Sequence, residues 1–195
     1  MSVRAIPGAL RRELRFSKTA IAANLESLGL SLAEVKPLTE ALFDEKGLLG
    51  LYGSELLLLE KILGIGSGEP AVALTGELIS VKTAPAGSGV SYGYLTRLTK
   101  PTTIGLVALG FSDGLPRSAT NKFSVSIDGV QHQGIGRIAM DQCVIDLGDS
   151  SPEVGSEVQF FSQEFSLAHF ASASGFSQLE ILGRIHSRVA RVWSE

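Results

Sequence analysis

Cysteine, tryptophan and histidine are scarce in this chain, whose 195 residues include one cysteine, one tryptophan and three histidines. The one cysteine, Cys143, cannot form an internal disulfide, and such cysteine usage is typical of a reducing compartment. The histidines have no metal-ligand spacing with one another or with Cys143, so we expect no metal site. These absences argue against a disulfide-rich secreted scaffold and against a zinc module.

The chain also lacks a large excess of charge of either sign, and it has no long apolar run. The formal net charge is −3 and acidic and basic residues are interspersed, so without a basic stripe we expect no nucleic-acid partner. The most apolar stretch, residues 48–65, is interrupted by Glu55, Glu60 and Lys61 and is too short and too charged to span a membrane. Residues 1–16 contain arginines but no apolar segment of the kind found in signal peptides. We therefore expect a soluble, cytoplasmic protein with no membrane partner.

The length suits one good-sized domain or two small ones, and the N-terminal third has mixed strand and helix signals. Weak alternation over residues 11–17 predicts a strand. Ser17 then has the position of a helix N-cap, because its hydroxyl can accept from the first free backbone N–H groups. Apolar residues follow at helical spacing, at Ile21, Leu25 and Leu28. Gly29 is predicted to end this helix.

A second helix is predicted from Ser31, because Glu34 stands three residues later as in a capping box. Pro37 would interrupt the middle of that helix. Its apolar face would consist of Leu32, Val35, Leu38 and Leu42.

The next three segments lead out of the N-terminal third. Residues 47–53 are short, apolar and flanked by glycine, which predicts a buried strand, and residues 54–63 predict a short helix. Residues 64–70 contain three alternating glycines, but no P-loop lysine follows them. This pattern favours a flexible connector.

From Ala71 onward the pattern is that of short strands separated by glycine-rich turns, with the spacing of barrels and sandwiches. Residues 123–128 alternate between apolar and polar, as in a half-buried strand, and Asp128-Gly129 predicts a hairpin turn. Residues 104–109 are continuously apolar, as in a strand covered on both faces. Three further elements are predicted: a strand around Val158 and Phe160, a short helix over residues 166–174, and a closing strand over residues 179–193.

Four stretches of this β-rich part resemble the alanine racemase family. They are AGSGVSYG, GFSDGLPR, GIGRIAMDQCVIDL and LEILGRIHSRVARVW, at residues 86–93, 110–117, 134–147 and 179–193. Their order and spacing are similar to those of the family's C-terminal domain, from about residue 71 to the last residue. The resemblance implies a mainly β fold, with an alanine racemase C-terminal-like β-barrel domain at residues 71–195.

The N-terminal part, residues 1–70, resembles both ends of the family's other domain, a TIM-type barrel. ELRFSKTAIAANLESL, residues 13–28, is similar to its opening strand and first helix, and KGLLGLYG, residues 46–53, to its last strand. A complete barrel of this type takes ~200 residues or more. We therefore interpret residues 1–70 as a small α/β remnant of a barrel, with most of the intervening elements missing.

The resemblance also implies a reaction. The family uses pyridoxal phosphate, bound to a lysine, and racemises alanine with a base on each face of the substrate carbanion. One base is that lysine, and the other is the tyrosine of the VSYG motif, which a partner subunit supplies and which Tyr92 matches here. Met140 and Asp141 match a turn whose methionine N–H meets the substrate carboxylate. Three more residues match the family's access channel: Phe111, Asp113 and Arg137.

The chain departs from the family at several of these positions. The family's lysine motif is absent: Lys18, Lys36, Lys46 and Lys61 are the lysines that precede the β-rich part, and none has that context. Phe111 replaces a channel tyrosine, Leu179 replaces a tyrosine that meets the cofactor phosphate, and Lys46 replaces an arginine that faces the pyridine nitrogen. A free phenol has a pKa of ~10 and is a poor base at neutral pH. A half-buried structural tyrosine is therefore the alternative for Tyr92, and an ion pair or turn cap is the alternative for Asp113 and Arg137.

Three functions remain open. The first is a non-catalytic relative that binds or regulates a partner, above all a full-length racemase. The second is a pyridoxal phosphate-dependent racemase-type isomerase that makes D-alanine, a peptidoglycan precursor, only as an assembly with Tyr92 as the base in trans. The third is a stand-alone small-molecule binder. For the chain alone we expect a pseudoenzyme without cofactor, which forms a homo-oligomer or a mixed dimer with a full-length racemase.

Overall fold

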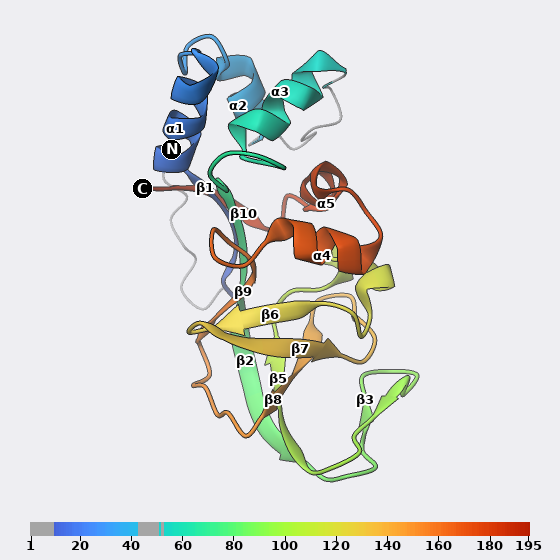
Figure 1. Ribbon diagram of the computed structural model, residues 1–195. Helices are drawn as coiled ribbons and strands as arrows, with labels where there is room; N and C mark the ends of the chain where they lie inside the picture. Colours follow the sequence, from blue (N-terminus) through green and yellow to red (C-terminus); the bar gives the residue numbers. More distant parts are fainter. Residues whose placement is uncertain (1–9, 43–50, 52) are drawn as a thin grey trace.

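The computed structural model describes residues 10–42, 51 and 53–195. Three helices gather at one end, strands coil into a barrel at the other, and two more helices lie against the barrel (Figure 1). The strands are β1 (Arg12–Ser17), β2 (Val72–Ala84), β3 (Gly89–Val90), β4 (Thr96–Arg97), β5 (Thr102–Val107), β6 (Ser124–Ile127), β7 (Val130–Ile135), β8 (Cys143–Gly148), β9 (Glu157–Phe161) and β10 (Ala190–Ser194). The helices are α1 (Lys18–Leu28), α2 (Lys36–Ala41), α3 (Ser54–Ile62), α4 (Leu167–Ser174) and α5 (Gln178–Arg184), with short 3-10 turns η2 (Phe111–Asp113) and η3 (Arg117–Ala119).

The barrel consists of β2, β5, β8, β7, β6 and β9, which pair in this order, and β9 pairs again with β2 to close the ring. All of these pairings are antiparallel. Asp128 and Gly129 join β6 to β7 with φ values of 50° and 78°, the two positive values that a type I′ hairpin turn requires. The mainly β fold with a barrel, implied by the resemblance, is thereby confirmed, and the helical part beside it is small.

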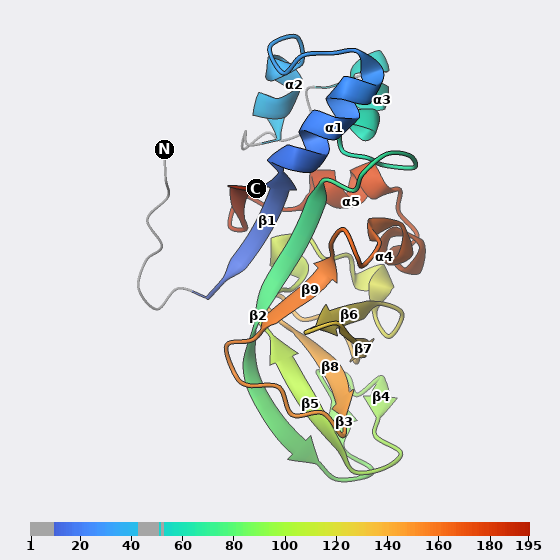
Figure 2. The same ribbon diagram turned by 60° about the vertical axis from the view of Figure 1, so that its left-hand side comes forward.

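Strand β1 ties the N-terminal segment to this barrel. It pairs antiparallel with the first half of β2 and parallel with β10, so that the first and last described strands are neighbours (Figure 2). A continuous hydrophobic core runs from Leu14 and Ile21 through Leu74 to Phe160. The division of the chain at residue 70 stays a prediction.

Helix α1 forms as its sequence predicts. The Ser17 side chain accepts a hydrogen bond from the Ala20 N–H at its start, and Gly29 ends it with a φ of 67°. Its buried Asn24 holds the connector that follows α3: Nδ2 donates to the carbonyls of Ile62 and Glu69, at 3.0 and 2.8 Å, and Oδ1 accepts from the Glu69 N–H at 2.8 Å. The buried face of α1 therefore fixes residues 62–69 through three hydrogen bonds as well as through apolar contacts.

Helix α2 begins later than predicted. The carboxylate of Glu34 accepts from the backbone N–H and the hydroxyl of Ser31, but this pair closes a turn and starts no helix. The helix begins at Lys36, which places Pro37 in its first turn. A proline is tolerated there because that N–H has no partner within a helix. The prediction of a helix from Ser31 with Pro37 in its middle is wrong.

The predicted closing strand over residues 179–193 is wrong in its first half. Residues 178–184 form α5, which starts with a capping box between Ser177 and Glu180. Ile181 and Leu182 are buried on its inner side, and only residues 190–194 form the strand β10. The predicted helices over residues 54–63 and 166–174, and the strand around Val158 and Phe160, are found as α3, α4 and β9.

Two strands differ from the predicted pattern of burial. Ser124 and Ser126 of β6 are buried, with 4% and 8% exposure, so both faces of this strand are covered and it is not half-buried. In β5 the opposite holds, because Ile104 and Leu106 remain partly exposed. The small β3–β4 hairpin covers this outer face only in part, through a second core of Ala84, Val90 and Leu98.

Residues 43–50 and 52, which include Lys46 and most of the strand predicted over residues 47–53, lie outside the described residues. No helix in the described part of the chain is long and apolar enough to cross a membrane. Nor do the described residues bring together three or more histidine, cysteine or acidic side chains that could hold a metal ion.

Candidate functional site

The VSYG motif forms a tight loop between β3 and β4. Ser91 and Tyr94 have positive φ values of 57° and 44°, unusual for residues other than glycine, and Gly93 lies between them at 78°. The Ser91 hydroxyl donates to the carbonyl of Arg137 at 2.7 Å, which fixes this loop on the third motif. Strained conformations of this kind persist only where the surroundings hold them, so the position of Tyr92 is determined by several contacts.

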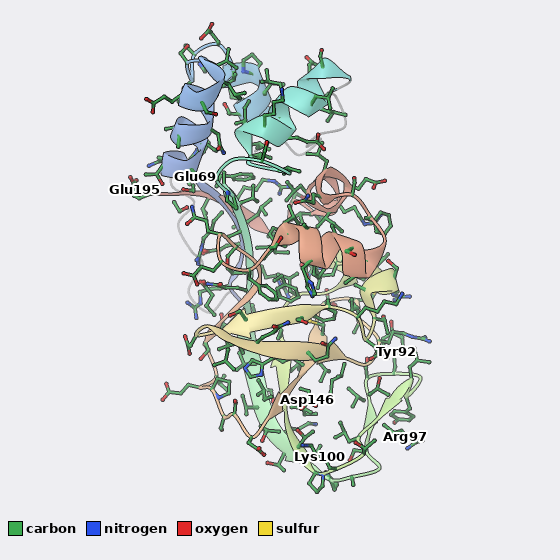
Figure 3. All side chains as sticks on the ribbon, viewed as in Figure 1. Glu69, Tyr92, Arg97, Lys100, Asp146 and Glu195 are labelled. Carbon is green, nitrogen blue, oxygen red and sulfur yellow. The ribbon has the colours of Figure 1, made fainter. Side chains whose placement is uncertain are left out.

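Tyr92 lies on the flank of the barrel beside β3, toward the end opposite the three N-terminal helices (Figure 3). Its side chain is 44% exposed, and its hydroxyl lies 3.5 Å from the carbonyl oxygen of Ile138, at the limit of a hydrogen bond. The guanidinium groups of Arg137 and Arg117 lie 5.3 and 5.9 Å from the centre of the tyrosine ring. Contacts of this kind between a cation and an aromatic face are attractive.

Phe111 and Met140 lie beside Tyr92. The guanidinium of Arg117 is 4.9 Å from the centre of the Phe111 ring, and its Nη2 is 3.6 Å from the sulfur of Met140. Phe111 is 39% and Met140 47% exposed. We call the surface formed by Tyr92, Phe111, Met140, Arg117 and Arg137 the tyrosine face.

The turn around Met140 is held through its backbone. The Phe111 N–H donates to the carbonyl of Ala139 at 2.9 Å, and the Ser112 N–H donates to that of Met140 at 2.7 Å. Within the described part of the chain the Met140 N–H has no acceptor. A backbone donor of this kind can bind a carboxylate, because its position depends on the shape of the backbone and not on the side chain.

Asp113 is fully buried behind this surface. One carboxylate oxygen accepts from the Gly110 N–H at 2.8 Å, and the other lies 3.1 Å from Nε of Arg188 and 3.7 Å from Nε of Arg12. Burial raises the pKa of Asp113 above its ordinary value, and the Gly110 N–H and the two guanidinium groups only partly offset this. Asp113 therefore has both features of the structural alternative, a turn cap through the Gly110 N–H and ion pairs with two arginines. Its role in an access channel stays a prediction.

The remaining predicted positions lie apart from the tyrosine face or next to it. Asp141 is exposed, and its carboxylate lies 2.8 Å from Nη2 of Arg188. Leu179 belongs to α5, where it is partly buried against the main core. Lys46 lies outside the described residues. The structure thus brings together Tyr92, Phe111, Met140 and Arg137, with Asp141 adjoining.

Three arginines of this region carry no role in the sequence-based predictions. Arg117 ends the second motif, and Arg188 belongs to the fourth, so their motifs could have drawn attention to them. Arg12 offers no such signal, because it is one of several charged residues in a weakly patterned strand. Its Nε donates to the carbonyl of Ala108 at 2.6 Å, close to the second motif.

The lysines can be compared with what a pyridoxal Schiff base requires, which is a desolvated amine of lowered pKa. The described lysines are all exposed: Lys18, Lys36, Lys61, Lys82, Lys100 and Lys122. Lys18 and Lys36 form surface ion pairs with Glu195 and Glu40. The described residues therefore do not fit covalent pyridoxal phosphate.

Comparisons with known proteins agree with the position of these motifs. Residues 71–193 match the family model described as alanine racemase, C-terminal domain. The chain is 44% identical over 128 residues to an alanine racemase from Streptomyces coelicolor, which covers 64% of this chain and 33% of that protein. It is 36% identical over 140 residues to an alanine racemase from Thiobacillus denitrificans, covering 71% of this chain and 38% of that protein.

Solved structures show the same likeness. The alanine racemase from Streptomyces coelicolor superposes with a TM-score of 0.66 at 39% identity, over 69% of this chain and 39% of that one. The alanine racemase from Streptomyces lavendulae also gives 0.66, at 33% identity, over 73% of this chain and 44% of that one. The chain thus spans between a third and a half of the length of these relatives.

Proposed function

The chain belongs to the alanine racemase family through its C-terminal domain, and we propose that it supplies this domain to an assembly with a barrel-bearing racemase subunit. Alone it does not racemise alanine in this proposal. The observation that carries the proposal is the tyrosine face, in which Tyr92 and Met140, the residues that the resemblance assigns to the site, share an exposed surface.

The groups on this face could form half of a racemase active site. Tyr92 offers a phenol hydroxyl that can exchange a proton, and the Met140 N–H offers a donor for a carboxylate. The guanidinium groups of Arg117 and Arg137 beside the phenol ring offer positive charge to an anionic ligand. A second base and a cofactor-binding lysine would have to come from the partner, since the described lysines do not fit that role.

The partner that suits this face is a full-length racemase in a mixed dimer, with a second copy of this chain as the simpler alternative. Aromatic and arginine side chains are enriched at the centres of protein interfaces, and the tyrosine face consists largely of them. A reducing cytoplasmic location suits the buried thiol of Cys143 and forms part of the proposal.

The first experiment tests the chain alone. Purified protein, with and without excess pyridoxal phosphate, should give no interconversion of L- and D-alanine. It should also lack the near-visible absorption of a pyridoxal Schiff base. Turnover that disappears in a Tyr92→Phe variant would show that the chain is itself a racemase.

The second experiment tests the assembly. The chain is mixed with a full-length alanine racemase, such as that of Streptomyces coelicolor, whose tyrosine at the position matching Tyr92 has been changed to alanine. Recovered activity should vanish with Tyr92→Phe but persist with Tyr94→Phe, a matched control in the same exposed loop.

Two other outcomes separate the remaining functions. Association without recovered activity would support the binding or regulatory role, because Phe111 and Leu179 lack hydroxyls that the family resemblance implies at their positions. A missing partner for a buried polar group costs ~1–3 kcal/mol. Absence of any association would reject the proposal in favour of a stand-alone binder.

A further inference from the structure

Arg188 lies on the turn between α5 and β10 and contacts two of the other motifs at once. Its Nε lies 3.1 Å from the carboxylate of Asp113, and its Nη2 lies 2.8 Å from that of Asp141. Asp113 is fully buried, whereas the Asp141 side chain is 58% exposed. One guanidinium therefore joins a buried anchor to an exposed residue next to Met140.

The anchor itself is held from several sides. The Asp113 carboxylate accepts from the Gly110 N–H, and its backbone carbonyl accepts from the His186 N–H at 3.1 Å. Arg12 reaches the same group from β1, with Nε 3.7 Å from the carboxylate and Nη2 3.5 Å from the carbonyl of Asp141. The carboxylate oxygen that faces Arg188 makes no hydrogen bond within the described residues, so Arg188 and Asp113 are held together by charge.

The Asp141 end of the bridge lies in the turn that contains the Met140 N–H, which has no acceptor among the described residues. Two hydrogen bonds from Phe111 and Ser112 hold the carbonyls of Ala139 and Met140, beside Gly110. The turn is also held by the bond from the Ala139 N–H to the Gln142 carbonyl, at 3.0 Å, and by the contact of Arg12 with the Asp141 carbonyl. Arg188 supplies a further attachment, through the side chain of Asp141.

We infer that Arg188 is a positioning residue, which holds the turn of residues 139–142 so that the Met140 N–H keeps its place on the tyrosine face. The use of that donor rests on the proposed function, but the positioning itself is a property of the chain alone. The guanidinium suits this task because its planar fork places Nε and Nη2 within ion-pair distance of two carboxylates at once.

Hydrogen exchange on the chain alone tests the positioning. The reporters are the N–H groups of Phe111 and Ser112, and the reference is the Gly134 N–H, which donates to the Phe123 carbonyl within the barrel. In Arg188→Met the two reporters should exchange about tenfold faster relative to the reference, since the lost pair is only partly exposed. Arg184→Met is the matched control, because Arg184 stacks on Phe176 and touches neither carboxylate.

Two milder variants keep the inference testable if Arg188→Met does not fold. Asp141→Asn removes only the exposed end of the bridge and should accelerate the reporters by about threefold, because this carboxylate is largely solvated. Arg188→Lys keeps the charge but cannot reach both carboxylates in one plane, so it should restore protection only in part. Equal acceleration of reporters and reference, or the same effect in Arg184→Met, would reduce Arg188 to a general stabilising residue and overturn the inference.

The mixed assembly with the altered full-length racemase supplies a second readout. Arg188→Met should raise the alanine concentration needed for half-maximal activity more than it lowers the maximal rate. The reason is that, in the proposed function, the Met140 N–H donates a hydrogen bond to the substrate carboxylate. If the unaltered chain does not associate, the proposed function fails while the exchange result still decides the positioning. If the chain associates and Arg188→Met alters neither the exchange nor the alanine dependence, the inference fails while the proposed function stands.

Discussion

Replacing Gly110 by alanine should separate the second motif from the turn around Met140. Gly110 has a φ of −145° and a ψ of −161°, an extended conformation that alanine adopts without strain. The obstacle is contact: an added Cβ would lie 2.5 Å from the Gln142 nitrogen and 2.6 and 2.7 Å from the carbonyl oxygens of Met140 and Ala139. All three are backbone atoms, so no side-chain rotation can relieve the overlap.

The expected cost follows from these contacts. Overpacking by one methyl group in a tight site costs ~1–3 kcal/mol. Moving the turn away would also weaken the hydrogen bonds from Phe111 and Ser112 to its carbonyls, each with a net contribution of ~1 kcal/mol. The free energy of unfolding should therefore fall by about 3 kcal/mol, which corresponds to a drop in Tm of about 6–12 °C for a chain of this size.

Urea denaturation at one fixed protein concentration measures this change, with an unaltered m-value showing that the unfolded state is the same. The matched control is Gly183→Ala. Gly183 lies within α5, and an added Cβ there meets no atom within 4 Å. Alanine is the better helix former, so this variant should gain ~0.5–1 kcal/mol. A Gly110→Ala variant within about 0.5 kcal/mol of wild type would refute the reasoning, because differences of this size are the usual error of such comparisons.

Four further predictions concern other parts of the molecule. The tyrosine face should drive self-association, since contiguous exposed aromatic and apolar side chains tend to find a partner; sedimentation velocity should show a concentration-dependent dimer that Tyr92→Ala weakens, and a monomer at high concentration would contradict this. Because burial raises the pKa of Asp113, the native state keeps this proton to higher pH than the unfolded chain does, so the free energy of unfolding should fall as pH rises through that window. Asp113→Asn, which cannot titrate, should lack this part of the pH dependence in a urea series at different pH values. Cys143 is buried and its thiol pKa is raised, so a thiol reagent should label it only on unfolding, and rapid labelling of the native protein would be inconsistent with the fold. Asn24→Ala should lower the free energy of unfolding by ~1–3 kcal/mol, because it leaves the buried Ile62 carbonyl and the partly buried backbone groups of Glu69 without this partner, and a change below ~0.5 kcal/mol would argue against these bonds.

Much of the local structure could be predicted from short-range signals. Ser17 and Gly29 mark the ends of α1 because caps depend on neighbouring backbone groups alone, and Asp128-Gly129 marks its hairpin for the same reason. One failure occurs where two local signals compete. In residues 179–193 the apolar pattern favours a strand, but the capping box at Ser177 and Glu180 starts a helix that the tertiary contacts of Ile181 and Leu182 retain.

The candidate site could be predicted only through the resemblance. Composition and spacing do not show that the Ser91 loop, the Phe111 turn and the Met140 turn meet, because strands far apart in the sequence bring them together. The ion pairs of Arg12 and Arg188 with Asp113 were missed for the same reason. Arg12 is followed directly by Glu13, and Arg188 has no acidic residue within six positions, so the sequence does not mark Asp113 as the partner of either.

The pairing of β1 with β10 also has a consequence for how the chain folds. Glu13 pairs with Ala190 in this parallel ladder, so its formation closes a loop that contains nearly the whole described chain. Such long-range contacts carry a loop-closure entropy and make folding slow. Strand β1 can meet β2 earlier, but during ribosomal synthesis its other edge stays unpaired until the residues of β10 have emerged. For that interval the growing chain has an open strand edge that neighbouring polypeptides can add to, which makes this step the one at which a chaperone would be most useful.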